Sequence, residues 1–207
     1  MAIDELTQTG RDASERRRAQ WIGIYIAALA VLLAICNMGG NNASKDAAKA
    51  NLDATNIWAF FQAKNLRRTH YMMWRDDLER QLIGQEDLPD EQRRKIESEL
   101  ADYKARIAKF TSDKKRNEGL DELWVRAKEL EKVRDDALRR DPFFDFGLAL
   151  LQIAIVLASV AIVTGGGLAI GLSVVVGAAG TVFMVNGFLM VEQLTAVLSR
   201  IMALAGG

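Results

Sequence analysis

A stripe of three polar side chains interrupts an apolar run in the second half of the chain. It consists of Asp145, Gln152 and Ser159, which follow one another at intervals of seven residues. Seven residues are close to two turns of an α-helix, so the three side chains share one helix face. A carboxylate, an amide and a hydroxyl in a row could line a wet path for cations. They could equally join neighbouring helices through hydrogen bonds, as Asn186 could in the next apolar run. We call these three residues the polar stripe, and both interpretations remain open from sequence.

The chain carries few side chains of the kinds that bind metals or act as nucleophiles. Cys36 is the single cysteine and His70 the single histidine, which leaves no intrachain disulfide and no zinc-type ligand set. Two acidic pairs, Asp76–Asp77 and Asp135–Asp136, are typical of solvated helix faces. No nucleotide-binding or protease motif accompanies them in the sequence. We therefore expect no catalytic, metal-binding or cofactor-binding residues, and a protein that is not an enzyme.

The polar stripe must be carried by long apolar segments that have almost no charge. Three such runs occur, namely Trp21–Met38, Phe146–Val163 and Leu168–Val191. A helix of about 20 apolar residues spans the roughly 30 Å hydrocarbon core of a bilayer, and it satisfies its own backbone hydrogen bonds there. The pattern predicts an all-α, polytopic membrane protein with three transmembrane helices, whose first partner is the lipid bilayer.

Between the first and second runs lies a polar block that holds most of the charge. Of 27 Lys and Arg residues 22 fall in Asn41–Pro142, as do 21 of 27 Asp and Glu residues. This near neutrality gives no basic excess that would attract nucleic acid. The predicted organisation is a polar tail (1–20), a first transmembrane helix (21–38), an extramembrane helical coiled-coil domain (39–142), a transmembrane helical hairpin (143–191) and an amphipathic C-terminal segment (192–207).

The polar block predicts a helical hairpin or a three-helix coiled coil. Paired Gly and Asn residues in Asn37–Asn42 indicate a kink or break. One helix should then run to about Ile83 and turn at Gly84–Pro89. A second helix has apolar residues at alternating spacings of four and three, typical of a coiled-coil seam. The seam residues are Ile96, Leu100, Tyr103, Ile107 and Phe110. A third helix should begin at Leu120 and end at Asp141-Pro142.

Small residues recur at four-residue spacing in the third apolar run and predict close helix packing. One row is Gly167 with Gly171, and the other is Ser173 with Gly177 and Thr181. Small side chains let helix backbones approach where lipid offers no hydrophobic contrast. Packing of the second and third spans against each other would use one row and leave the other for another subunit. We therefore expect a homo-oligomer.

Three segments resemble one protein family. Asn56–Lys64, with the sequence NIWAFFQAK, is similar to the N-x-W-A-F-(F/Y)-Q-A-K segment of the bacterial domain-of-unknown-function family 4337. Asn37–Gly40 and Leu151–Ser159 are similar to segments of the same family, in the same order and spacing. The resemblance covers residues 20–190. It implies the membrane architecture and a bacterial origin, and it suggests that Trp58–Lys64 and Gln152 matter, but it implies no activity.

Positive charges beside the apolar runs bear on orientation. Arg16–Arg18 abut the first run, and positive charge beside a span favours the cytoplasmic side. Arg139 and Arg140 beside the second run favour the opposite orientation. Because long loops weigh little in this rule, we expect the helical domain outside the cytoplasm of a multi-pass protein in the bacterial inner membrane.

Taken together, these features favour a protein of assembly rather than of catalysis. We expect a scaffold or interaction module that self-assembles, or binds a protein partner, through its coiled-coil domain. The alternative is an oligomeric ion channel or small-solute pore lined by the second transmembrane helix.

Overall fold

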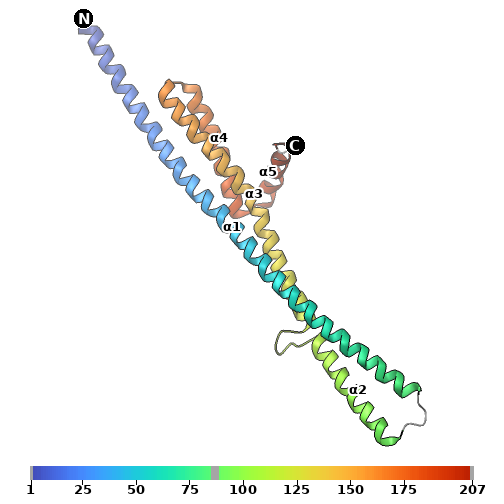
Figure 1. Cartoon of the computed structure of the whole chain (residues 1–207). Coiled ribbons are helices and arrows are strands. Elements are labelled where there is room, and N and C mark those ends of the chain that lie inside the picture. Colours follow the sequence, from blue (N-terminus) through green and yellow to red (C-terminus); the bar gives the residue numbers. More distant parts are fainter. Residues whose placement is uncertain (1, 85–88, 206–207) are drawn as a thin grey trace. The chain divides into compact units, whose positions relative to one another are not determined.

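The computed structural model describes residues 2–84 and 89–205, and within these ranges the protein consists of five α-helices without strands. They are α1 (Ala2–Gly84), α2 (Asp90–Thr111), α3 (Leu120–Thr164), α4 (Gly167–Leu189) and α5 (Glu192–Ala205) (Figure 1). The all-α prediction is therefore confirmed. Helices α1, α3 and α4 each contain a segment long and apolar enough to cross a membrane. The predicted turn at Gly84–Pro89 contains residues 85–88, which lie outside the described residues.

The chain divides into two compact units, and α1 and α3 contribute to both. The first, which we call the apolar unit, comprises Met1–Asp46 and Asp136–Gly207. The second, which we call the polar unit, comprises Ala47–Asp135. The polar stripe lies in the apolar unit, and the predicted coiled-coil seam lies in the polar unit.

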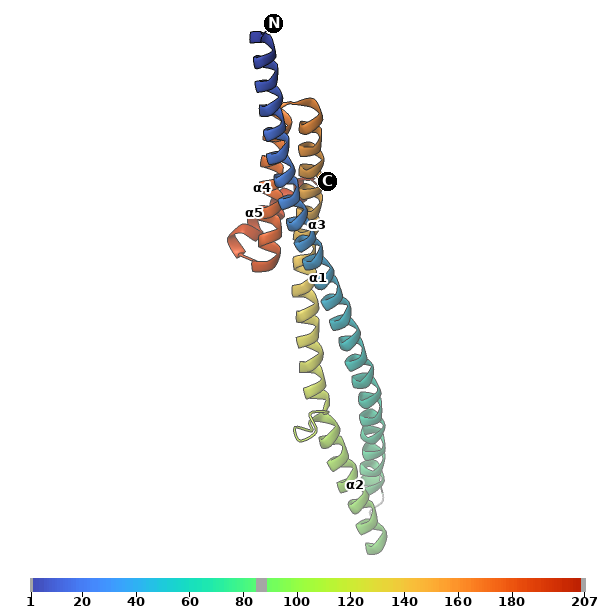
Figure 2. The ribbon, with the colours of Figure 1, turned by 90° about the vertical axis from the view of Figure 1, so that its left-hand side faces the viewer.

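In the apolar unit, α1, α3 and α4 lie side by side (Figures 1 and 2). Their shared core includes Leu29 of α1, Leu151 and Ala154 of α3, and Met184 of α4. The α3 and α4 backbones come together at two glycines, since a Cβ built on Gly180 would lie 3.1 Å from the carbonyl oxygen of Gly147. The turn between these helices is closed by Arg18, which donates a hydrogen bond to the Gly165 carbonyl at 2.8 Å.

Helix α5 packs against the hairpin that α3 and α4 form. Its Leu198 is buried in a cluster with Phe143 of α3 and Phe183 of α4. The reversal between α4 and α5 occurs at Met190, which adopts the left-handed conformation with φ 48°. A left-handed residue at the end of a helix stops it and lets the chain change direction.

Helix α1 runs through the segment in which the sequence predicted a kink or break. A break at Asn37–Asn42 is therefore wrong, because α1 is continuous from Ala2 to Gly84. Each glycine in a helix interior costs about 1 kcal/mol relative to alanine. Here the glycines make room for packing, since a Cβ on Gly39 would lie 2.4 Å from the ring of Phe144. The Phe144 side chain is buried, and its packing offsets the poor helix propensity beneath it.

Helix α3 likewise continues past the point at which the sequence predicted its end. Pro142 lies inside the helix, which extends from Leu120 to Thr164. Proline in a helix interior removes a backbone hydrogen bond and costs about 3 kcal/mol. The next two residues, Phe143 and Phe144, are buried against neighbouring helices, and this tertiary packing holds the helical conformation across the proline.

In the polar unit, α2 and the beginning of α3 pair with successive parts of α1. Tyr71 of α1 lies 5.6 Å from Tyr103 and 5.7 Å from Phe110 of α2, measured between ring centroids. Nearer the start of the unit, Trp58 of α1 donates from its indole Nε1 to Glu131 of α3 at 2.8 Å. Along α2, Arg68 of α1 meets Thr111 and Glu79 of α1 meets Lys104, so α2 runs antiparallel to α1. Along α3, Trp58 meets Glu131 and Asn51 meets Arg134, so α3 is antiparallel to α1 as well.

Candidate functional site

The polar stripe lies on the outward face of α3. Asp145, Gln152 and Ser159 are all exposed, whereas the opposite face of α3 is buried in the helix bundle. The buried residues on that face include Leu151, Ala154, Ala158 and Ala161. The structure therefore brings the three predicted residues onto one exposed face, as their spacing requires. Asp145 also lines a small cavity with Asn37 and Asn41 of α1, so only Gln152 and Ser159 lie on the part of this face that points away from the bundle.

Of the three stripe residues, Ser159 has a hydrogen bond within α3, and Asp145 lies in polar surroundings. Ser159 donates its hydroxyl proton to the carbonyl oxygen of Ile155 at 2.8 Å. Asp145 lies one helical turn from Asp141, which accepts a hydrogen bond from Ser44 of α1 at 2.8 Å. The start of the apolar segment of α3 is therefore polar, and the exposed Asp145 can reach water or headgroups there.

The side-chain amide of Gln152 differs from Ser159 because it has no hydrogen-bond partner among the described residues. Among the hydrogen bonds of the described residues none involves its side chain, and its neighbours on the exposed surface are the large apolar residues Ile153 and Val156. An amide moved into an apolar medium without a partner costs about 4–8 kcal/mol on a cyclohexane scale. A hydrogen bond between helices in a membrane is worth only about 0.6 kcal/mol on average. The cost of leaving the amide unpaired in lipid is much larger than the gain from any one hydrogen bond. In a bilayer the Gln152 amide must therefore contact protein or water.

The buried polar side chains of the apolar segments are hydrogen-bonded inside the chain. Ser173 is fully buried and donates to the carbonyl oxygen of Ala154 at 2.6 Å, while Tyr25 donates to the carbonyl oxygen of Ser173 at 3.1 Å. Asn186 is also fully buried. Its Nδ2 donates to the hydroxyl of Thr195 at 3.2 Å, and its Oδ1 accepts from the backbone N–H of Val191. These groups join helices and clamp the turn between α4 and α5.

The two rows of small residues have different environments. A Cβ on Gly177 would lie 2.9 Å from the Tyr25 hydroxyl and 3.1 Å from Leu29, so this row packs against α1. Thr181 is half-buried and donates to the Gly177 carbonyl at 2.8 Å. In contrast, a Cβ on Gly167 or Gly171 would meet nothing within 4 Å. The first row therefore lies on the surface of the described chain.

The predicted coiled-coil seam faces α1 within the polar unit. All five of its residues, Ile96, Leu100, Tyr103, Ile107 and Phe110, are partly buried. Tyr103 and Phe110 pack against the ring of Tyr71, and Trp74 lies 6.0 Å from Tyr103. The seam is thus occupied by the same chain.

The segment Asn56–Lys64, which resembles the family sequence, joins α1 to α3 in the polar unit. Trp58 donates to Glu131, and its ring meets that of Phe61 edge to face at 5.4 Å. Lys64 donates to the carbonyl oxygen of Glu118, just before α3 begins. The hydrogen bond from Lys128, followed by that from Trp58, lowers the pKa of Glu131 below its usual value. Trp58 and Lys64 therefore hold the start of α3 against α1.

One surface was not identified from sequence. The outward face of α1 in the polar unit exposes several large apolar side chains, namely Leu52, Phe60, Leu66, Met73 and Trp74. Leu52, Leu66 and Met73 recur at intervals of seven or multiples of it, which is the signal that could have revealed the face. It was hidden because the inward seam of the same helix has the same period.

No curated protein and no solved structure matches the chain in comparisons with known proteins. One family model does match, over residues 18–190. The match includes the polar stripe, the segment from Trp58 to Lys64 and all of α2. The chain belongs to the family described as Domain of unknown function (DUF4337).

Proposed function

We propose that this protein is a non-enzymatic membrane scaffold whose subunits join through the polar stripe of α3. One observation carries the proposal: Gln152 is exposed in the middle of an apolar segment and forms no hydrogen bond within the described chain. A second copy would present the same amide at the same depth, so two or more Gln152 side chains could pair with each other. Such pairing gives the Gln152 amides hydrogen bonds that lipid cannot supply.

The partner-binding part of the scaffold is assigned to the outward face of α1 rather than to the seam of α2. The α2 seam packs on α1 and is already occupied. The exposed residues Leu52, Leu66 and Met73 remain available. We place the protein in the bacterial inner membrane with the polar unit outside the cytoplasm. Labelling of a Lys114→Cys variant by an impermeant maleimide in intact cells supports this orientation, and labelling only after lysis reverses it.

Substitution of Gln152 by leucine tests the subunit contact. Leucine keeps the size and helix propensity of the side chain but removes the amide that needs a hydrogen-bond partner. We expect Gln152→Leu to lower the number of subunits per particle, measured by native mass spectrometry from nanodiscs, while the helix content remains that of the parent.

Two control variants separate assembly from folding. Gln193→Leu removes an exposed glutamine of α5 outside the stripe, and it should leave the subunit number unchanged. Tyr103→Ala removes aromatic contacts with Tyr71 and Trp74, and it should lower thermal stability without changing the subunit number. A parent protein that is a monomer in nanodiscs contradicts the scaffold.

A pore is the second candidate, and the same stripe favours it. If subunits form a ring with α3 inward, Gln152 would face a wet axis, and Asp145 would place carboxylates at one mouth, which attracts cations. We expect Asp145→Asn to lower cation conductance in planar bilayers if this is so. Purified protein that assembles but passes no current rules out the pore and leaves the scaffold.

A further inference from the structure

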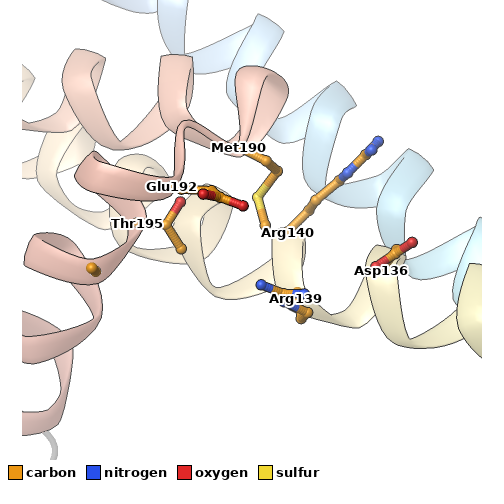
Figure 3. A pocket seen from close by; sticks show the side chains of 7 residues that line it. Asp136, Arg139, Arg140, Met190, Glu192 and Thr195 are labelled. Carbon is orange, nitrogen blue, oxygen red and sulfur yellow. The ribbon is translucent and has the colours of Figure 1, made fainter.

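A cavity of about 540 Å³ lies between α3 and α5 of the apolar unit (Figure 3). It is located where α3 is about to enter its apolar segment and where α5 begins. The residues around it are Asp136, Arg139, Arg140, Met190, Glu192, Thr195 and Ala196. The volume falls in the range of small-ligand sites, about 300–1,000 Å³.

The cavity is lined by equal numbers of positive and negative side chains, and these side chains form no ion pairs with one another. Two guanidinium groups, those of Arg139 and Arg140, and two carboxylates, those of Asp136 and Glu192, line the cavity, and the Arg140 side chain points away from Glu192 (Figure 3). Among the described residues, the ion pairs of the protein involve none of these four. Figure 3 shows Glu192 and Thr195 on α5 across from Arg139 on α3. A ligand that carries both signs of charge matches such a cavity better than one that is purely anionic.

Thr195 supplies a hydroxyl group whose oxygen is positioned by a hydrogen bond. Its oxygen accepts a hydrogen bond from Nδ2 of Asn186 at 3.2 Å. Asn186 is fully buried and is held by the N–H of Val191. Because the Thr195 oxygen accepts from Asn186, its own proton points in another direction, and no hydrogen bond donated by this hydroxyl is found among the described residues. The proton is therefore available to an oxygen atom in the cavity.

The position of the cavity along the chain indicates the source of its ligand. Arg139 and Arg140 come just before the buried Phe143 and Phe144, and Glu192 is the first charged residue after the apolar helix α4. Helices α3 and α4 are antiparallel, so these residues mark the same end of both apolar segments. In a bilayer this end lies at the level of the lipid headgroups, where arginine binds phosphate well through its planar set of donors.

We propose that the cavity binds the headgroup of a zwitterionic phospholipid with a primary ammonium, such as phosphatidylethanolamine. Arg139 and the Thr195 hydroxyl donate to the phosphodiester oxygens, and Glu192 accepts from the ammonium. Choline lacks the N–H donors that Glu192 requires, and glycerol headgroups leave both carboxylates without a cation. The inference rests on the membrane insertion in the proposed function but not on the subunit contact.

Native mass spectrometry of the full chain with added lipids tests this site. We expect phosphatidylethanolamine to bind at least about fivefold more tightly than phosphatidylcholine or phosphatidylglycerol of the same acyl chains. Arg139→Gln and Thr195→Val should each weaken phosphatidylethanolamine binding about tenfold, since hydrogen bonds to charged groups are worth about 1.5–3 kcal/mol. Glu192→Gln should remove the preference over phosphatidylcholine and leave phosphatidylcholine binding unchanged.

Controls distinguish this site from general lipid contact and from subunit assembly. Arg200→Gln changes an exposed basic residue of α5 that does not line the cavity, and it should have no effect. The same lipid preference should persist in Gln152→Leu, whatever its subunit number. Equal affinity for the three lipids, or phosphatidylethanolamine binding unchanged in both Arg139→Gln and Thr195→Val, overturns the proposal. Displacement of the lipid by an equal concentration of soluble glycerophosphoethanolamine overturns its membrane source.

Discussion

At the scale of single residues, glycines decide where the helices of the apolar unit touch. Gly39 lies under Phe144, whose ring would be 2.4 Å from a Cβ at that position. Gly23 of the same helix would have nothing within 4 Å of its Cβ. The two positions share a residue type and a helix, and they differ only in what packs against them.

Alanine substitution should separate these two glycines. Gly39→Ala forces the buried Phe144 ring to move, and overpacking of this kind costs about 1–3 kcal/mol. Gly23→Ala meets no atom, so it should be neutral or should stabilise α1 by up to about 1 kcal/mol, the difference in helix propensity. Thermal unfolding of the full chain in detergent, followed by circular dichroism, measures both. Equal melting temperatures for the two variants would contradict the packing described for Gly39.

The residue scale is also where sequence analysis was least complete. The spacing of Asp145, Gln152 and Ser159 established that they share a face, but not whether that face points inward. Asn186 could be read as a hydrogen-bonding group, yet its partner Thr195 lies beyond a left-handed turn at Met190 that has no glycine to signal it. Contacts of this kind depend on the tertiary arrangement, which periodicity alone does not encode.

At the scale of elements, two carboxylates fasten the start of α3 in the polar unit. Glu122 accepts hydrogen bonds from the Ser112 hydroxyl and the Asp113 N–H. The Ser112 hydrogen bond is the main cause that lowers the pKa of Glu122. For Glu131 the Lys128 hydrogen bond comes first and that of Trp58 second, and together they also lower its pKa. A carboxyl group with a lower pKa in the folded state stabilises the fold when it is ionised.

The polar unit should therefore lose stability in acid. Both pKa values lie below the unfolded-state value near 4.5, so their contribution is complete above that pH and is lost as the pH falls through the folded-state values. We expect Glu122→Gln with Glu131→Gln to reduce the drop in melting temperature of the full chain between pH 7 and pH 3.5. Glu129→Gln, an exposed neighbour, serves as the control. A drop that is the same in all three proteins would contradict this role.

Sequence patterns predicted the elements better than their ends. The apolar runs and the α2 period are long signals, and each coincides with a helix in the structure. The breaks at Asn37–Asn42 and at Pro142 were wrong because local propensities of about 1–3 kcal/mol were outweighed by packing of Phe143 and Phe144. In the polar unit other contacts pair α2 and the start of α3 with successive parts of α1, namely the rings around Tyr71 and the hydrogen bond from Trp58 to Glu131.

At the scale of the whole molecule, the apolar unit hydrogen-bonds its two buried polar side chains and leaves the amide of Gln152 exposed on an apolar segment. Ser173 and Asn186 are buried and hydrogen-bonded. Gln152 is exposed on an apolar face, and the described chain offers its side chain no hydrogen bond. The central claim is that a second copy of the protein covers this face in the membrane.

Cysteine cross-linking in native membranes tests that claim most directly. In a Cys36→Ser chain that keeps Gln152, a cysteine replaces the exposed Ser159 on the same face of α3. In separate variants a cysteine replaces Val31 on α1 or Val175 on α4, which are 60% and 67% exposed. Oxidation with copper phenanthroline should join two chains through Ser159→Cys. The other two positions face lipid in this account and should yield little covalent dimer. Efficient cross-linking at Val31→Cys or Val175→Cys, with none at Ser159→Cys, would contradict the account.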